Sequence, residues 1–251
     1  MALQSLGIIP ARFASSRFPG KPLVMINGKS MIMRVYEQAR KSKTLNKIIV
    51  ATDDERIFNH VLEAGGEVMM TAGSHVSGTS RIGEVVSALS SSGKCPYDIV
   101  VNIQGDEPFI EPAQIDLAVS VFQNPEAKIG TLISRVSDTA DLMNPNVVKV
   151  VTDHSGRAMY FSRSPIPFLR GGTDGDWAKQ SEYFRHIGLY AFRTQVLLQL
   201  IDLPAVASEV AESLEQLRWM YHGYSIHTAL TDIETIGIDA PEDLLKLTNN
   251  A

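Results

Sequence analysis

Short apolar runs alternate with amphipathic segments through the first half of the chain, and this alternation constrains the fold more than any other feature. The segments 6–9, 47–51, 67–71 and 98–103 have the length and residue types of buried strands. Apolar side chains at helical spacing follow Ser30, the pair Asp53-Asp54 and Thr79, and Pro112 opens a further helix. Such alternation predicts an α/β protein, with a mostly parallel central sheet covered by helices on both faces.

The pattern changes near residue 144, where strand signals begin to follow one another without long helices between them. We expect an antiparallel insertion or small subdomain at about 140–190, within a single domain of residues 1–251. This insertion is also the expected dimerisation surface. The expected strands are 147–151, 158–162, 184–192 and 225–230, with a helix over 208–221 and a terminal helix after residue 239.

The composition limits the class of protein. With 44% hydrophobic and 20% charged residues, the chain has the composition of an ordinary soluble globular protein. A formal net charge of −5 argues against non-specific binding to nucleic acid or to a membrane surface. We find no apolar run of transmembrane length, no signal-peptide pattern and a single cysteine, Cys95, so a cytoplasmic protein without disulfides is expected.

A loop rich in cations follows the first expected strand. It carries Arg12, Arg17 and Lys21 close to Gly20, at the place where open α/β sheets bind nucleotides. Three cations in one short loop of an acidic chain predict a phosphate site, and a triphosphate is the natural anion. The loop is neither a Walker A motif, since Pro22 follows the lysine, nor a dinucleotide fingerprint. The plainer alternative is a solvated surface loop.

Two aspartates are candidate metal ligands. Asp106 lies in the run Gln-Gly-Asp-Glu-Pro at 104–108, just after the most apolar expected strand and at the sheet edge that faces the ligand crevice. A carboxylate there suits Mg²⁺, which takes one or two carboxylates together with substrate phosphates, although an ordinary turn residue is the alternative. Asp239 fits a metal role and equally fits a capping box with Glu242 at the start of the terminal helix.

Other polar residues give weaker signals. Ser77 and Thr79 fit a helix cap and could also bind a ribose or a base. His186 lies in an apolar strand, where packing is the commoner role, and Arg163 leaves a strand where it could grip a carboxylate. Residues 215–216 fall inside an expected helix, where polar side chains are usually solvated. We find no zinc-ligand spacing and no arguable Ser-His-Asp arrangement in the sequence.

Ten segments, in order along nearly the whole chain, resemble one known family. The opening run Ile-Pro-Ala-Arg-Phe-Ala-Ser-Ser-Arg-Phe-Pro-Gly-Lys-Pro-Leu closely resembles the signature of the 3-deoxy-manno-octulosonate cytidylyltransferases, also called CMP-Kdo synthetases. The runs Arg-His-Ile-Gly-Leu-Tyr at 185–190 and Glu-Gln-Leu-Arg at 215–218 are the more specific motifs. The similar segments are 9–23, 51–54, 70–71, 77–79, 102–108, 144–151, 160–163, 185–190, 215–218 and 237–244.

The resemblance implies a nucleotide-diphospho-sugar transferase fold, a homodimer, and transfer of CMP from CTP to the anomeric hydroxyl of Kdo, with Mg²⁺, for lipopolysaccharide biosynthesis. Arg12, Lys21, Asp106 and Asp239 would be catalytic, with the two aspartates as metal ligands. The implied nucleotide-binding residues are Pro10, Ala11, Arg12, Ser15, Arg17, Lys21, Thr71, Ser77, Gly78, Thr79, Gln104 and Asp106. The implied sugar-binding residues are Gln104, Arg163, His186, Tyr190, Glu215 and Gln216.

The sequence departs from the family pattern at a few positions, and three alternatives stay open. Phe13 and Phe18 stand where Tyr and Leu are frequent, Ser80-Arg81 replaces a commoner acidic-Arg pair, and residues 171–179 match no family pattern. The first alternative is a CMP-sugar synthetase for a sialic acid or for an 8-amino analogue of Kdo. The others are a metal-dependent glycosyltransferase, whose usual Asp-x-Asp is absent, and a non-catalytic nucleotide-binding module.

Overall fold

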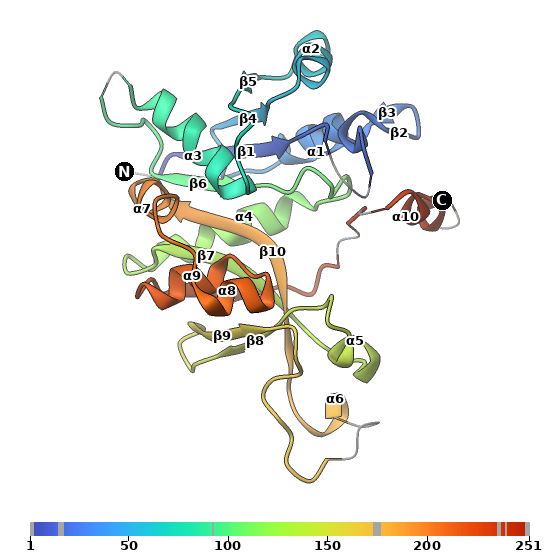
Figure 1. The fold of residues 1–251 in the computed structure, drawn as a ribbon, viewed down its shortest axis with the longest axis vertical. Helices are drawn as coiled ribbons and strands as arrows, with labels where there is room; N and C mark the ends of the chain where they lie inside the picture. The colour runs from blue at the N-terminus through green and yellow to red at the C-terminus, as the bar shows by residue number, and fades with distance from the viewer. Residues whose placement is uncertain are drawn as a thin grey trace.

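A nine-stranded sheet forms the centre of the computed structural model, which describes residues 3–14, 18–91, 93–172, 177–234, 237–238 and 240–248. The strands of this sheet are β1 (Ser5–Ala11), β4 (Lys47–Thr52), β5 (Val68–Met70), β6 (Ile99–Asn102), β7 (Ile129–Arg135), β8 (Lys149–Thr152), β9 (Ala158–Ser162), β10 (Phe184–Arg193) and β11 (Ile226–Leu230). Its main path runs β11–β7–β10–β6–β1–β4–β5 (Figure 1). All neighbours on this path pair in parallel except β10, which runs antiparallel to both β6 and β7.

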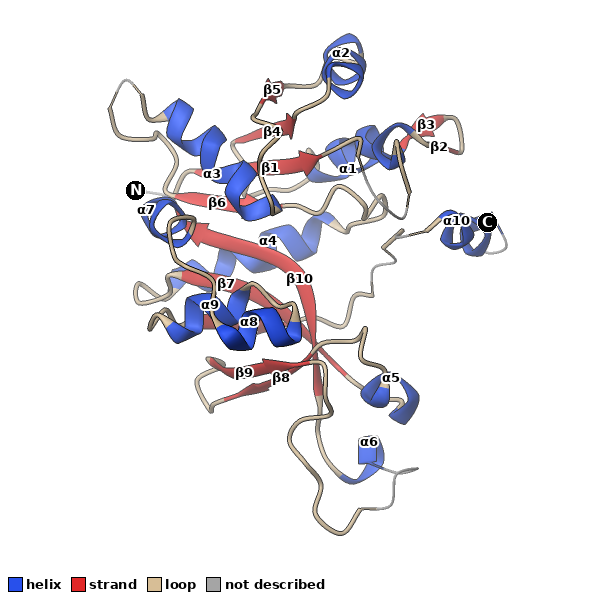
Figure 2. Cartoon of the chain, viewed as in Figure 1, coloured by secondary structure: helices blue, strands red, loops and turns tan. Residues whose placement is uncertain are grey.

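Helices cover both faces of the sheet (Figure 2). The helices are α1 (Met31–Ala39), α2 (Glu55–Glu63), α3 (Gly78–Leu89), α4 (Pro112–Ser120), α5 (Thr139–Met143), α6 (Trp177–Gln180), α7 (Thr194–Leu200), α8 (Ala207–Glu212), α9 (Gln216–Tyr221) and α10 (Pro241–Thr248). One apolar cluster joins α1, α2 and α4 to the sheet, and a second joins α3, α7 and α9 to it. No helix in the described ranges has the length and apolarity needed to cross a membrane.

The expected α/β architecture is confirmed, because a mostly parallel sheet lies between two helical layers. The helix predicted after Asp53-Asp54 is α2, and it begins where the Asp54 side chain accepts a hydrogen bond from the amide of Arg56. One helix predicted over 208–221 is wrong. The backbone at Ser213 takes a left-handed conformation, with φ of 50°, and divides this segment into α8 and α9.

The antiparallel segment is continuous with the central sheet. β8 and β9 pair with each other, and the first residues of β10 pair with β8 before the same strand continues between β6 and β7. In Figure 1 these two strands, together with α5 and α6, extend away from the rest of the sheet. The sequence reading missed β7, which is one of the two strands that hold β10 in place. A separate subdomain at 140–190 stays a prediction.

A small hairpin and a single-turn helix complete the region after β1. The strands β2 (Met25–Ile26) and β3 (Lys29–Ser30) form a two-stranded antiparallel sheet. They follow a 3-10 turn at Lys21–Leu23, which begins after Gly20 with φ of 73°. The Gly20 amide donates to the carbonyl oxygen of Phe13 at 2.9 Å, so the chain at Gly20 lies beside the end of β1.

Candidate functional site

A pocket of about 240 Å³ lies where the carboxyl ends of β1 and β6 meet. Parallel neighbours in an open α/β sheet place their carboxyl ends at the same edge, so the loops that follow them converge on one crevice. The pocket is lined by Pro10, Ala11, Arg12, Lys21, Pro22, Ser77, Gly78, Arg81, Gln104, Gly105 and Asp106. Most of the described residues predicted to bind the nucleotide therefore come together, as the position of the two loops led us to expect.

A second hollow, of about 500 Å³, lies near the amino end of β6. It is lined by side chains such as Tyr97 and Arg193 and contains none of the predicted site residues. Although it is the larger of the two, it lies at the amino end of β6, whereas open α/β sheets bind their ligands at the carboxyl ends of the strands.

Two glycines let the walls of the pocket come close together. A Cβ atom at Gly105 would lie 2.9 Å from the carbonyl oxygen of Pro10. A Cβ atom at Gly78 would lie 3.3 Å from Cγ of Pro10. Since the first contact is against backbone, a side chain at 105 would force the loops after β1 and β6 apart.

Lys21 and Asp106 are paired inside this pocket. The Lys21 ammonium lies 2.8 Å from Oδ2 of Asp106 and 2.9 Å from the carbonyl oxygen of Ile238. The amide of Ile238 in turn donates to the carbonyl oxygen of Asp106, at 2.9 Å. The segment before α10 is thereby held against the candidate metal ligand. Asp239, the second predicted metal ligand, lies outside the described residues, as do Ser15 and Arg17.

The N-terminus of α3 connects the two predicted substrate sides. Ser77 and Ser80 form a capping box, which confirms the expected helix start. The hydroxyls of Ser77 and Thr79 donate to the two carboxylate oxygens of Glu215, at 3.0 and 2.6 Å. Glu215 was expected in the middle of a solvated helix, but it lies at the N-cap of α9 and is half-buried. Glu215, which was predicted to bind the sugar, is thus hydrogen-bonded to Ser77 and Thr79, which were predicted to bind the nucleotide.

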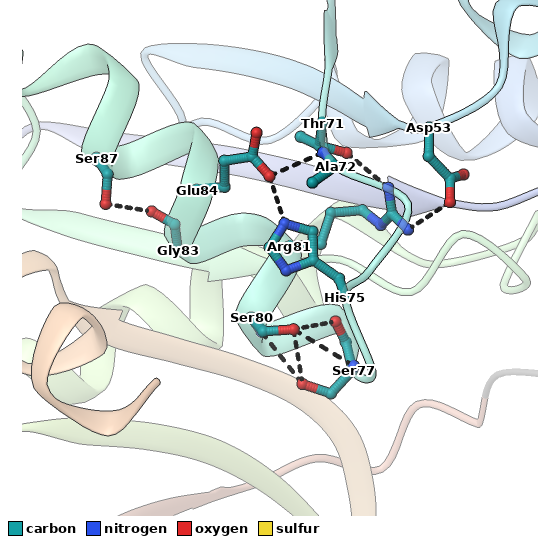
Figure 3. Close-up of polar contacts among 10 residues, drawn as sticks. All are labelled: Asp53, Thr71, Ala72, His75, Ser77, Ser80, Arg81, Gly83, Glu84 and Ser87. Carbon is teal, nitrogen blue, oxygen red and sulfur yellow. Dashed lines mark hydrogen bonds and ion pairs between the residues drawn. The ribbon is translucent and has the colours of Figure 1, made fainter. Parts of the chain in front are cut away.

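A buried arginine fixes the loop between β5 and α3 (Figure 3). Arg81 is 2% exposed, and its guanidinium donates to the Thr71 hydroxyl at 2.6 Å and to Oδ2 of Asp53 at 3.0 Å. One helical turn further, the Glu84 carboxylate contacts the His75 ring, and this hydrogen bond lowers the pKa of Glu84. These contacts position Thr71, a predicted nucleotide-binding residue, relative to the pocket.

A bulge in β10 shapes the predicted sugar side. Between Ile187 and Tyr190 the strand carries two more residues than its partner β7. The Gln104 amide donates to the carbonyl oxygen of Gly188 in this bulge, at 3.0 Å. The Thr131 hydroxyl lies 2.9 Å from the carbonyl oxygen of Leu189. Bulges redirect side chains near active sites, and this one is fixed by polar contacts from the loop after β6 and from β7.

Tyr190 is buried on this strand, and His186 is half-buried. His186 packs edge-on against Phe161, and its Nε2 atom lies 2.9 Å from the Thr131 hydroxyl. Burial lowers the pKa of His186 to about 3, so the ring is neutral at physiological pH. Burial also raises the pKa of Tyr190. Both side chains are therefore uncharged, which favours hydrogen bonding over ionic contacts at this position.

Arg163 uses its guanidinium to hold the junction between α8 and α9. It donates to the carbonyl oxygens of Glu212, Pro145 and Ser213, at 2.6, 2.9 and 3.4 Å. The Glu212 carboxylate accepts hydrogen bonds from the Ser162 hydroxyl and from the Arg163 amide. A grip of Arg163 on a substrate carboxylate stays a prediction, and it would have to compete with these main-chain contacts. Gln216 follows the same junction and is buried.

The sequence pattern did not indicate the roles of two polar residues near the pocket. Either Asp53 or Asp54 was expected to cap the next helix, and Asp54 does so, while Asp53 is the partner of Arg81. Asn102, which the pattern predicts only as part of an apolar strand, is a buried polar side chain at the end of β6, beside the site. A polar amide inside the most apolar segment of the chain was the signal that could have identified it.

Comparisons with known proteins agree with this geometry. The cytidylyltransferase family matches residues 6–232 of the chain. Two similar curated proteins are the 3-deoxy-manno-octulosonate cytidylyltransferases of Cytophaga hutchinsonii and Porphyromonas gingivalis. The first is 49% identical and covers 98% of this chain and 97% of the relative, and the second is 50% identical and covers 98% and 96%.

Solved structures show the same fold. The structure described as CMP:2-keto-3-deoxy-manno-octonic acid synthetase complexed with CTP superimposes with a TM-score of 0.90, is 40% identical and covers 98% of both chains. The 4-diphosphocytidyl-2C-methyl-D-erythritol synthase of Anaerococcus prevotii, at 15% identity and a TM-score of 0.64, shares the fold alone.

Proposed function

The chain belongs to the 3-deoxy-manno-octulosonate cytidylyltransferases, and from this premise we propose that the pocket between β1 and β6 is where it transfers CMP from CTP to Kdo. The products are CMP-Kdo and pyrophosphate, and the product's use is lipopolysaccharide biosynthesis. One observation carries the assignment of the pocket. Arg12 and Lys21 lie with Asp106 in one crevice at the carboxyl ends of two parallel strands, and we propose that the triphosphate binds there.

The residues of the pocket suit phosphoryl transfer. The anomeric hydroxyl of Kdo would lose its proton to solvent, and its oxygen would form a bond to the α-phosphorus in line with the leaving oxygen as the bond to pyrophosphate breaks. Such transfers depend on positioning and on stabilising charge rather than on covalent chemistry by the protein. Arg12 and Lys21 would offset the negative charge that accumulates on the leaving pyrophosphate.

Asp106 is the residue best suited to hold Mg²⁺. Its carboxylate faces the cation Lys21 at 2.8 Å, so the position already accommodates positive charge next to a hard oxygen ligand. Within the described residues no group of three or more acidic, histidine or cysteine side chains surrounds it. This agrees with a site completed by substrate phosphates and, we propose, by Asp239. Bound Mg²⁺ would supply charge stabilisation at the phosphates and lower the pKa of a bound hydroxyl.

The sugar side would be formed by the β10 bulge and the start of α9. Neutral His186 and Tyr190 would contribute hydrogen-bonding groups from β10. Gln104 lines the pocket and is already tied to the bulge, so it is well placed to contact both substrates. The remaining proposed sugar-binding residues are Arg163, Glu215 and Gln216.

The antiparallel segment is the proposed homodimer interface. Large apolar side chains of this segment are exposed in the single chain. Among them are Met159 and Tyr160 of β9, and Phe168, which is 76% exposed. A second copy would remove such surface from water. Light scattering coupled to size-exclusion chromatography should give the mass of two chains for the parent protein, and Phe168→Asp should shift the mass toward one chain. A parent protein with the mass of one chain would contradict the interface.

Pyrophosphate release tests the proposed function. The protein would be assayed with CTP and Mg²⁺ against Kdo, 8-amino-Kdo and N-acetylneuraminic acid, and with UTP and ATP in place of CTP. Release with CTP and Kdo is expected, with Asp106→Asn lowering turnover at limiting Mg²⁺ and the exposed Asp202→Asn control unchanged. Release with another acid alone would overturn the substrate, and CTP binding without any release would favour the binding-module alternative.

A further inference from the structure

We propose that Asn102 is a further substrate-binding residue, whose carboxamide oxygen accepts a hydrogen bond from a ring hydroxyl of a bound substrate. The inference rests on the proposed function and names a residue that the sequence motifs did not assign. The hydroxyl belongs either to the ribose of CTP or to the sugar acid, because Asn102 lies between the two predicted sides of the site.

Asn102 is a buried acceptor without a partner. The side chain is 5% exposed, and Oδ1 makes no hydrogen bond with the residues that the structure describes. An unsatisfied acceptor in the interior is costly, because the group has lost water and gained no donor in return. Buried polar groups of this kind need an explanation, and a ligand donor is one that the surroundings support.

The cross-strand neighbour of Asn102 is also a buried polar side chain without a hydrogen-bond partner among the described residues. Tyr190 of β10 lies directly opposite Asn102 of β6 in the antiparallel ladder, so the two side chains stand on the same face of the sheet. The Tyr190 ring is 7% exposed, and its hydroxyl also lacks a partner among the described residues. One unsatisfied acceptor and one unsatisfied donor on adjacent strands form a pair that a hydroxyl could bridge, since a hydroxyl both donates and accepts.

The pair adjoins the pocket. Nδ2 of Asn102 lies 3.7 Å from the position that a Cβ atom of Gly78 would occupy, and Gly78 lines the pocket. Gln104, two residues after Asn102, lines it as well. A charge also lies close by, because the carboxylate of Glu215 raises the pKa of Tyr190 in addition to burial. Ring hydroxyls of both substrates would reach a polar corner made by β6, β10 and the start of α9.

Two substitutions test the role of Asn102, so that the test still works if one of the variants fails to fold. Asn102→Ala removes the acceptor, and Asn102→Val fills part of the space with a residue suited to a strand. We expect either variant to raise the KM of one substrate about tenfold while the KM of the other changes less than twofold. The melting temperature should stay within a few degrees of the parent value, because an unsatisfied acceptor has been removed.

The KM values of the two substrates show whether the hydroxyl belongs to the sugar acid or to the ribose of CTP. A rise in the KM of Kdo alone assigns the contact to the sugar acid. A rise in the KM of CTP alone, with the KM of dCTP the same for the variant and the parent protein, assigns it to the ribose 2′-hydroxyl. If both KM values stay at the parent level, or if kcat and the melting temperature fall together with neither KM changed, the side chain is structural and the proposal is overturned.

Tyr183 provides a matched control. It is 1% exposed, and its hydroxyl also lacks a partner in the described part of the chain, but it lies in a separate apolar cluster with Trp177, Val136 and Leu142. Tyr183→Phe should leave both KM values unchanged, whereas Tyr190→Phe should change the same KM as Asn102→Ala. A parent protein that releases no pyrophosphate would refute the proposed function, whereas an active parent with normal Asn102 variants would refute this inference alone.

Discussion

Replacing Asp53 with Asn should weaken both the fold and CTP binding, because Asp53 neutralises the buried Arg81. The Arg81 side chain is 2% exposed and that of Asp53 is 21% exposed, with 3.0 Å between NH2 and Oδ2. Breaking a buried ion pair by removing one charge costs about 3–5 kcal/mol. Since Asp53 is partly exposed and Asn keeps an acceptor, we expect about 2 kcal/mol of lost unfolding free energy.

That loss can be converted into a shift of the melting temperature. With an unfolding entropy of about 2.1 cal/mol/K per residue, a chain of 251 residues loses about 2 °C for each kcal/mol. Asp53→Asn should therefore lower the melting temperature by about 4 °C in a calorimetric scan. Because Arg81 lines the pocket and holds Thr71, the KM of CTP should rise several-fold while the KM of Kdo stays near the parent value.

The control variant is Glu67→Gln, which removes one charge from an exposed pair. Lys47 and Glu67 lie 2.7 Å apart, but their side chains are 33% and 56% exposed. Exposed pairs contribute less than about 1 kcal/mol, so this variant should melt within about 2 °C of the parent protein. If Asp53→Asn melts as the control does and binds CTP normally, Arg81 does not depend on Asp53 and the reasoning fails.

Three further predictions concern other parts of the chain. Lys21→Met should lower kcat/KM for CTP by about 100-fold, because it removes a charge-assisted contact to the triphosphate, and Lys21→Arg should recover part of the lost activity. Near-normal pyrophosphate release by Lys21→Met would argue against a role of Lys21 in binding the triphosphate. Because the pKa of His186 falls from 6.5 to about 3 on folding, its neutral form contributes stability that is complete above pH 6.5 and is lost as the pH falls toward 3. Urea unfolding between pH 4 and 7 should accordingly show a shallower pH dependence for His186→Gln, and equal slopes would contradict the burial argument. Ser213→Gly should stabilise the fold by up to about 1 kcal/mol, since a left-handed backbone favours glycine, and a lower melting temperature would refute this.

The sequence predicted what depends on local pattern. The strands before the basic loop and before Asp106 were found in place because they are short, apolar and followed by turn residues. The cap at Ser77 follows from the chemistry of helix starts. Gly105, Arg12 and Lys21 converge because parallel strands bring their carboxyl ends together.

What the sequence did not predict depends on contacts between distant residues. No glycine or proline marks Ser213, so the break between α8 and α9 could not be read from the pattern, and Arg163 holds this turn from 50 residues away. The insertion of β10 between β6 and β7 is likewise a long-range pairing, and periodicity gives no information on strand order. The partner of Arg81 was equally invisible, because Asp53 is 28 residues distant in the chain.

The position of Glu215 has a consequence for how the two substrates affect each other. In the described structure its two carboxylate oxygens are engaged by Ser77 and Thr79, which were predicted to face the nucleotide. A sugar group that draws on Glu215 has to share or replace these hydrogen bonds, and so changes the position of two hydroxyls on the other side of the site. Because coupling between two sites is reciprocal, CTP must then change the affinity for Kdo by the same factor as Kdo changes the affinity for CTP. Glu215→Gln keeps the shape but weakens both contacts, so it should bring that factor closer to one in binding titrations of each substrate with and without the other.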